Sequence, residues 1–245
     1  MANDRATTIP LDDIEDGDWY AQRGPVSIDG REQQFIRLIE ELARKRPLTG
    51  QKYNRTMRKF VVEGLPWLSK GQLLGVYEQL CAAGALTFDP EMRTALQMKP
   101  TRSQAGVTVV TVLTKPYPCP GECIFCPTDV RMPKSYLHDE PGAQRAERHG
   151  FDPYTQTRAR IRALEQIGHP AEKIELLILG GTWSSYTREY QEWFVKRCFD
   201  AINEVEAQTL AEAQAINEKG KRRNVGLVVE TRQDRIDDAE LRWLR

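Results

Sequence analysis

The chain of 245 residues has no excess charge of either sign and no long apolar run. Its 35 basic and 35 acidic residues cancel, so net charge alone indicates no acidic or basic partner. No stretch approaches the roughly 18 apolar residues that a membrane-spanning helix needs. The opening sequence MANDRATTIP lacks the basic start and the apolar core of a signal peptide. We therefore expect a cytoplasmic protein without a membrane partner.

Cysteine is scarce, and its distribution is uneven. The chain has five cysteines, an odd number, and three of them (Cys119, Cys123 and Cys126) lie within the eight residues CPGECIFC. Such crowding excludes a disulfide framework and indicates a metal or cluster site in a reducing compartment. Cys81 and Cys198 stand alone in segments with a helical pattern, where cysteine is usually a small buried apolar side chain.

The first part of the chain changes character near residue 31. Residues 1–30 are poor in apolar side chains and contain the acidic stretch LDDIEDGDWY, which predicts a disordered acidic tail. Residues 31–100 are typical of a helical region of four helices, because apolar residues recur at helical spacing. Pro47 and Gly50 end the first helix, and Ser69 stands where a helix N-cap is expected.

A dense group of basic residues falls in this helical region. No acidic residue occurs between residues 44 and 59, whereas seven basic residues do: Arg44, Lys45, Arg46, Lys52, Arg55, Arg58 and Lys59. Several recur every three or four residues, which gives one helix face a basic stripe. The stripe is either a phosphate-binding surface or a solvated helix face. Tyr53 either stacks on a base or packs inside the protein.

Residues 101–245 alternate between strand and helix patterns. The apolar, β-branched runs at 106–113, 174–182 and 224–232 predict three strands. Helical patterns lie between them, at 152–168 and over one long helix at 187–218, and another follows the third strand. This order is typical of a parallel α/β sheet or barrel. Three such units rarely make a stable parallel barrel, so we expect the sequence to be a fragment or to lack the rest of its fold.

The three clustered cysteines predict a cluster with one open position. Structural zinc sites usually take four ligands as two separated pairs, whereas here three thiolates come from one loop. Three thiolates suit a [4Fe–4S] cluster whose fourth iron stays open to an exogenous ligand. The alternative from the residues alone is a Cys₃His zinc site that uses His138 or His149.

The spacing Cys119-x-x-x-Cys123-x-x-Cys126, with Phe125 before the last cysteine, resembles the radical S-adenosylmethionine (SAM) superfamily. The resemblance implies a partial (β/α)-barrel in which the open iron binds SAM. It also implies that Phe125 lies near the adenine. ILGGT, with Gly180, Gly181 and Thr182, resembles the glycine motif that contacts SAM in that superfamily, and VVETR offers Glu230 and Arg232 to its ribose or carboxylate.

Longer stretches resemble one family within that superfamily, the catalytic subunit of Elongator. They are KPTRSQAGVTVVTVLTKPYPCPGECIFCP, FDPYTQTRARIRALEQIGHPAEKIELLILGGTW and VGLVVETRQD. The resemblance implies C5 carboxymethylation of the tRNA wobble uridine, U34, by a 5′-deoxyadenosyl radical with acetyl-CoA as carbon donor. It also implies that Lys173 contacts acetyl-CoA, that residues 31–100 bind tRNA, and that the partner is a second copy or Elongator-like subunits. We expect the acetyltransferase-like domain of that family to have no counterpart within these 245 residues.

Two other functions remain open at this point. The first is a non-catalytic or zinc-containing module that binds tRNA. The second is another radical SAM enzyme that modifies RNA, such as a methylthiotransferase. Such an enzyme should carry additional cluster cysteines, and Cys81 and Cys198 are too isolated to serve as such a set.

Overall fold

The computed structural model describes residues 26–245, so nearly all of the expected acidic tail lies outside the described residues. The chain divides into two compact units. We call residues 26–105 with 163–169 the helical unit, and residues 106–162 with 170–245 the sheet unit. Residues 26–30 do not belong to a tail, because Val26 and Ile28 pack against the core of the helical unit.

The helical unit contains the four helices expected from the sequence. They are α1 (Glu32–Arg44), α2 (Gly50–Val62), α3 (Lys70–Ala82) and α4 (Pro90–Leu96), followed by a 3₁₀ helix at Pro100–Ser103. Side chains of Thr49, Ser69 and Asp89 accept backbone N–H groups at the starts of α2, α3 and α4. These caps satisfy donors that a helix start otherwise leaves unpaired.

A continuous apolar core joins the four helices. Phe35, Leu38 and Leu42 of α1 are fully buried against apolar side chains from the other three helices, including Met57 and Leu74. Residues 163–169, which the sequence assigns to the α/β region, also pack here. The Met98 N–H donates to the Ile167 carbonyl at 3.0 Å, and Gly168 approaches the side chain of Leu74 too closely for a Cβ to fit.

The sheet unit is an α/β structure with three parallel strands. Its elements are β1 (Thr108–Leu113), α5 (Pro141–Arg148), α6 (Pro153–Glu165), β2 (Lys173–Leu179), α7 (Arg188–Asn203), α8 (Leu210–Glu218), β3 (Arg223–Val229) and α9 (Asp238–Leu244). Short 3₁₀ helices cover Trp183–Ser185 and Gln233–Arg235. The strand order is β1-β2-β3, with β2 in the centre. The division between the two units falls inside α6.

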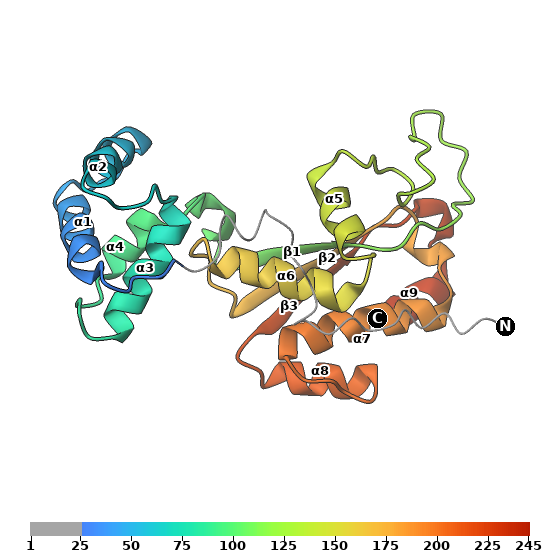
Figure 1. The fold of residues 1–245 in the computed structure, drawn as a ribbon. Coiled ribbons are helices and arrows are strands. Elements are labelled where there is room, and N and C mark those ends of the chain that lie inside the picture. Colours follow the sequence, from blue (N-terminus) through green and yellow to red (C-terminus); the bar gives the residue numbers. More distant parts are fainter. Residues whose placement is uncertain (1–25) are drawn as a thin grey trace. The chain divides into compact units, whose positions relative to one another are not determined.

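Burial along the strands explains why these segments form a sheet. Val110 of β1 lies opposite Leu176 of β2, and Val112 lies opposite Ile178, and all four side chains are buried. The alternate positions of β2 are only half-buried. This period of two places one face of the sheet in the core. α7 and α8 pack beside β3 and against each other (Figure 1).

One expected helix is wrong in extent. The sequence predicts a single helix over 187–218, whereas α7 ends at Asn203 and α8 begins at Leu210. Glu204 adopts a left-handed conformation (φ +59°) that stops α7. The buried Asp200 carboxylate accepts the N–H of Ala207 at 3.1 Å and holds the returning chain. Thr209 then caps α8. α5 is a helix that the sequence analysis did not identify.

The carboxyl ends of the three strands lie along the same edge of the sheet, which we call the carboxyl edge. β1 leads into the long loop 114–140, drawn as an extended green-to-yellow segment before α5 (Figure 1). β2 and β3 each end three residues before the expected boundary, so 180–182 and 230–232 are loop residues. Loops at this edge are the usual place for ligand sites in α/β proteins. Among residues 26–245, no helix is both long and apolar enough to cross a bilayer.

Candidate functional site

The three clustered cysteines lie on loop 114–140, each beside a different polar group. All three are free thiols. Cys119 Sγ lies 3.2 Å from the Thr182 hydroxyl. Cys126 Sγ lies 3.6 Å from the Ser135 hydroxyl. The Cys119 contact therefore joins the cysteine loop to the glycine-containing loop after β2.

The sulfur atoms of the three cysteines are not arranged around a common metal position. Within residues 26–245, no group of three His, Cys, Asp or Glu side chains is arranged to hold a metal ion. His138, the alternative zinc ligand, has its Nδ1 3.2 Å from Asp129 Oδ2 instead. The chemistry of the donor set nevertheless fits an iron–sulfur cluster, because three unpaired thiols on one loop are the ligands that such clusters take.

The second half of the loop that carries the cysteines is anchored in the core of the sheet unit. Met132 is buried with Leu113, Ala143 and Ala146, where β1 meets α5. By contrast Ile124 and Phe125, between the second and third cysteines, are 100% and 87% exposed. Apolar side chains that stand free in water gain stability when a ligand covers them. The structure therefore leaves Phe125 able to contact a bound molecule.

The Glu230 carboxylate connects the three loops at the carboxyl edge through hydrogen bonds. Its Oε2 accepts the hydroxyl of Tyr136 at 2.7 Å and the N–H groups of Gly180 and Gly181 at 3.1 and 3.4 Å. Burial and the carboxylate raise the pKa of Tyr136 far above its usual value, so the phenol stays a donor. Sequence reasoning missed Tyr136, because no local pattern around it indicates a contact with a residue 94 positions later.

Gly180 and Gly181 are required at their positions for separate structural reasons. Gly180 has φ +143°, and a Cβ there would lie 1.8 Å from the hydroxyl of Thr114. Gly181 has φ +86°, and its Cβ would lie 3.0 Å from the Lys134 carbonyl. Both values favour glycine. Loop 114–140 therefore passes directly over the end of β2, which brings the first two motifs together.

Arg232 connects the end of β3 to the cysteine loop. Its Nε and Nη2 each donate to the Asp234 carboxylate at 2.9 Å. Its Nη1 donates to Cys123 Sγ at 3.1 Å. The Asp234 carboxylate holds the pKa of Arg232 above its usual value. The structure thus points this guanidinium at a cysteine sulfur.

A set of tyrosines that sequence reasoning also missed lies beside the glycine loop. Tyr186 is buried, and its hydroxyl donates to the Lys115 carbonyl at 2.7 Å and lies 2.8 Å from the hydroxyl of Thr114. Burial raises the pKa of Tyr186 to about 12. The rings of Tyr117 and Tyr190 lie 4.6 and 4.9 Å from its ring. These contacts fix the start of the cysteine loop against α7.

Lys173 lies at the opposite edge of the sheet. It is the first residue of β2 and pairs in register with Arg223, the first residue of β3. Gly180 stands seven positions further along the chain, just after β2 ends, which corresponds to roughly 23 Å of extended strand. The structure does not bring Lys173 together with the cysteines.

Most of the seven basic residues of the helical unit have partners within that unit. Lys45 and Lys59 both pair with Glu41, at 2.6 and 2.7 Å, and these two ammonium groups lower the pKa of Glu41. Arg46 pairs with Asp89 at 2.8 Å and with Glu91 at 3.1 Å. A stripe that looks uninterrupted in the sequence is therefore partly neutralised by acidic side chains from α1 and α4.

The remaining basic residues leave two cations on the surface of α2. Lys52 donates to the carbonyls of Lys45 and Pro47, and Arg44 donates to the Glu40 carbonyl. Arg55 and Arg58 are exposed and make no hydrogen bond or ion pair within residues 26–245. These two guanidinium groups are the best-placed contacts for an external anion.

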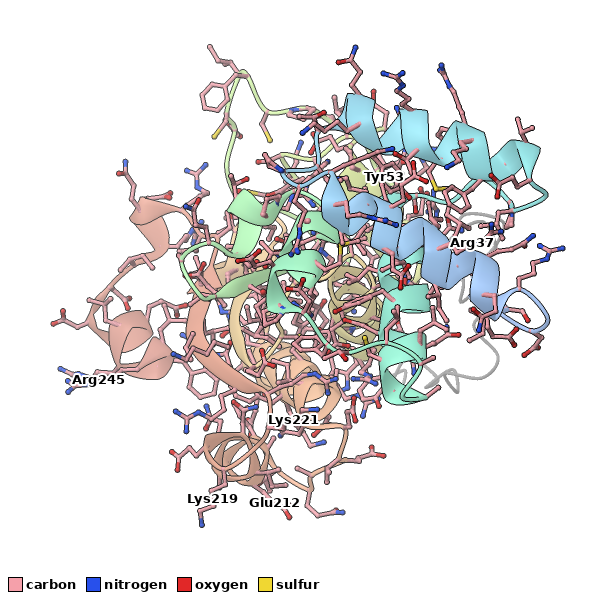
Figure 2. The ribbon with its side chains drawn as sticks, turned by 90° about the vertical axis from the view of Figure 1, so that its left-hand side faces the viewer. Arg37, Tyr53, Glu212, Lys219, Lys221 and Arg245 are labelled. Atoms are coloured by element: carbon pink, nitrogen blue, oxygen red, sulfur yellow. The ribbon has the colours of Figure 1, made fainter. Side chains whose placement is uncertain are left out.

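Tyr53 belongs to the core. It is 4% exposed, and its hydroxyl donates to the Leu68 carbonyl at 2.9 Å. It lies where α2 faces α1 (Figure 2). Of the two possibilities that the sequence left open, packing inside the protein is correct.

The Tyr136–Glu230 contact has a measurable consequence. We expect Tyr136→Phe to lower the free energy of unfolding of the sheet unit by about 1–2 kcal/mol, because a charge-assisted hydrogen bond is lost. Urea titration followed by circular dichroism measures it. Tyr154→Phe is the matched control, since the Tyr154 hydroxyl makes no hydrogen bond within the described chain. Equal stabilities of the two variants would contradict the role of Tyr136.

The chain resembles curated proteins from all three domains of life over about 150 residues. It is 51% identical over 152 residues to the tRNA uridine(34) acetyltransferase of Methanocaldococcus infernus, and 46% identical over 143 residues to that of Dehalococcoides mccartyi. It is 35% identical over 150 residues to Elongator complex protein 3 of Homo sapiens. Over these residues the chain is similar to the catalytic subunit of Elongator. No family model matches it.

The match to these Elongator relatives is partial on both sides. It covers 60% of this chain and 28% of the M. infernus protein, and 57% of this chain and 27% of the human protein. A solved structure of M. infernus Elp3 that lacks residues 1–46 is 43% identical, with a TM-score of 0.43, and covers 57% of this chain and 26% of that one. The chain thus spans less than a third of the length of these relatives.

Proposed function

We propose that this chain forms part of a radical SAM enzyme that carboxymethylates C5 of the tRNA wobble uridine, U34, with acetyl-CoA as carbon donor. The observation that carries the proposal is the meeting of three loops at the carboxyl edge. The cysteine loop, the Gly180–Thr182 loop and the Glu230–Arg232 loop contact one another there. The names of the curated relatives supply the substrate, tRNA uridine 34. The sheet unit would then be the first part of a (β/α)-barrel.

The residues at the carboxyl edge have separate roles in this proposal. Cys119, Cys123 and Cys126 would hold a [4Fe–4S] cluster, which when bound supplies the electron that splits SAM into methionine and a 5′-deoxyadenosyl radical. The backbone of Gly180 to Thr182 lets SAM approach closely. Phe125 would cover the adenine. Glu230 commits one oxygen to Tyr136 and the glycine loop, which leaves its other oxygen to accept a donor from SAM.

Acetyl-CoA would be held away from this edge. Lys173 and its register neighbour Arg223 place two cations at the amino-terminal edge of the sheet, where they suit an anionic group. The acetyl group would have to reach the carboxyl edge for its methyl hydrogen to be removed. The cluster ligands and Lys173 therefore belong to two separate parts of one proposed reaction.

Anaerobic reconstitution with iron and sulfide, followed by an assay for 5′-deoxyadenosine in the presence of SAM and a reductant, tests the proposal. We expect a coloured protein with iron and sulfide bound and 5′-deoxyadenosine formed. A colourless protein that holds zinc and binds tRNA with full affinity would overturn it and favour the non-catalytic tRNA-binding module.

The proposed tRNA surface makes its own prediction. We expect Arg55→Glu with Arg58→Glu to weaken tRNA binding at least about tenfold and to reduce the salt slope of binding by about 2, because two phosphate contacts are lost. Filter binding over a range of salt concentrations measures both. Lys59→Glu is kept separate, because Lys59 also pairs with Glu41.

The matched control reverses charges on the sheet unit. Lys219 and Lys221 lie at and after the end of α8, on the surface (Figure 2). Reversing both changes the net charge by as much as the α2 double variant does. We expect little change in affinity. Equal loss of affinity in both variants would mean that general attraction, not the α2 surface, holds the tRNA.

A further inference from the structure

The guanidinium of Arg232 faces a cysteine sulfur and is fixed there on two sides. Asp234 takes two of its nitrogens at 2.9 Å each, which leaves Nη1 directed at Cys123 Sγ, 3.1 Å away. A fork held by two parallel bonds to a carboxylate has little freedom to rotate. The hydrogen bonds of Nε and Nη2 therefore fix the direction of Nη1.

The cysteine loop is shaped to admit this contact. A Cβ on Gly121 would lie 1.9 Å from Arg232 Nη1 and 2.6 Å from its guanidinium carbon. Only a residue without a side chain leaves room for the guanidinium at this place. Gly121, Cys123 and Arg232 thus form one arrangement, although Arg232 stands 109 positions after Cys123.

We propose that Arg232 is a positioning residue that sets the reduction potential of the cluster through its hydrogen bond to the Cys123 sulfur. The inference rests on the proposed function, since it needs the cluster. A hydrogen bond to a ligating sulfur and a fixed positive charge both favour the more negative, reduced state of an iron–sulfur cluster. Arg232 therefore makes the cluster easier to reduce. This role differs from the contact with the ribose or carboxylate of SAM that the sequence predicts.

Asp234 contributes to the same arrangement of side chains. Its carboxylate pairs with Arg232 and so fixes the direction of the free nitrogen. A lysine at position 232 would keep the charge but lose the fork, so its ammonium would not be aimed. The planar group and not the charge alone carries the proposed effect.

The test is a redox titration of the reconstituted full chain without SAM, followed by electron paramagnetic resonance of the reduced cluster. At the solution potential that reduces half of the wild-type cluster, we expect Arg232→Gln to lower the ratio of reduced to oxidised cluster about tenfold. For one electron this corresponds to about 59 mV. We expect the ratio of reduced to oxidised cluster in Arg232→Lys to lie between the ratios in the wild type and in Arg232→Gln.

Two further variants separate the contact from general effects. Arg235→Gln removes the same charge from an exposed neighbour whose side chain makes no hydrogen bond to a cysteine within residues 26–245, and we expect less than a twofold change in the ratio. Gly121→Ala keeps every charge but displaces the guanidinium, so it should shift the ratio in the same direction as Arg232→Gln. It also keeps the test decisive if Arg232→Gln fails to assemble a cluster.

Each outcome decides one claim. An assembled cluster whose potential is unchanged in both Arg232→Gln and Gly121→Ala overturns the inference and leaves the proposed function intact. Unchanged potential with weakened SAM binding in Arg232→Gln returns Arg232 to the role of a SAM contact. A wild-type protein that takes up no iron and sulfide overturns the proposed function, and the inference falls with it.

Discussion

Cys123→Ala is expected to hold almost no iron and sulfide after anaerobic reconstitution, compared with roughly four of each per chain in the wild type. Three thiolates leave one of the four irons without a protein ligand, whereas two thiolates leave half of the irons without one. The loss should appear as missing visible absorbance and as iron and acid-labile sulfide contents near the baseline. Formation of 5′-deoxyadenosine should fall to background with it.

The matched control for this variant is Cys81→Ala. Cys81 is also a free thiol, but it lies in α3 of the helical unit, packed against that unit's core. We expect this variant to bind as much iron as the wild type. Cys198 is less suitable, because it is fully buried in α7, where burial raises its pKa to about 12, and its loss leaves a cavity. Full iron content in Cys123→Ala would contradict the assignment of the cysteine loop.

The parts of the fold that depend on neighbouring residues in the sequence could be predicted. The strands follow from short apolar runs such as VTVVTVL, and the helical unit follows from its apolar period and from caps such as Ser69. The sequence also orders the three motifs after three successive strands. Because parallel strands that follow one another end at one edge, the meeting of those motifs can be inferred without knowledge of side-chain packing.

The features that the sequence did not predict depend on contacts between distant segments. The break between α7 and α8 comes from Asp200 holding the N–H of Ala207 and from a left-handed Glu204, and neither residue type forces a helix to end. Likewise Lys59 looks free in the sequence, but Glu41 from the preceding helix neutralises it. Tyr136 is recognisable only once β3 lies beside β2.

The glycine at the end of β2 carries the second large prediction. We expect Gly180→Ala to lower the free energy of unfolding of the sheet unit by about 2–6 kcal/mol. One part is the strained backbone, about 1–3 kcal/mol at φ +143°. The other is overpacking, about 1–3 kcal/mol, because the new Cβ would lie 1.8 Å from the Thr114 hydroxyl and 3.0 Å from its Cβ. Guanidinium unfolding followed by circular dichroism measures the change.

Two further variants divide this effect into its causes. Gly106→Ala places a methyl group at φ +78° in open space, so it tests backbone strain without a clash and should cost about 1 kcal/mol. Thr114→Ala removes the hydroxyl that the new Cβ meets. The double variant Thr114→Ala/Gly180→Ala should therefore be about 1–2 kcal/mol more stable than the sum of the single changes predicts. Strict additivity would mean that the glycine is required for its backbone conformation alone. A positive coupling would instead mean that the close passage of loop 114–140 over the end of β2 requires it, and that passage brings Cys119 to Thr182.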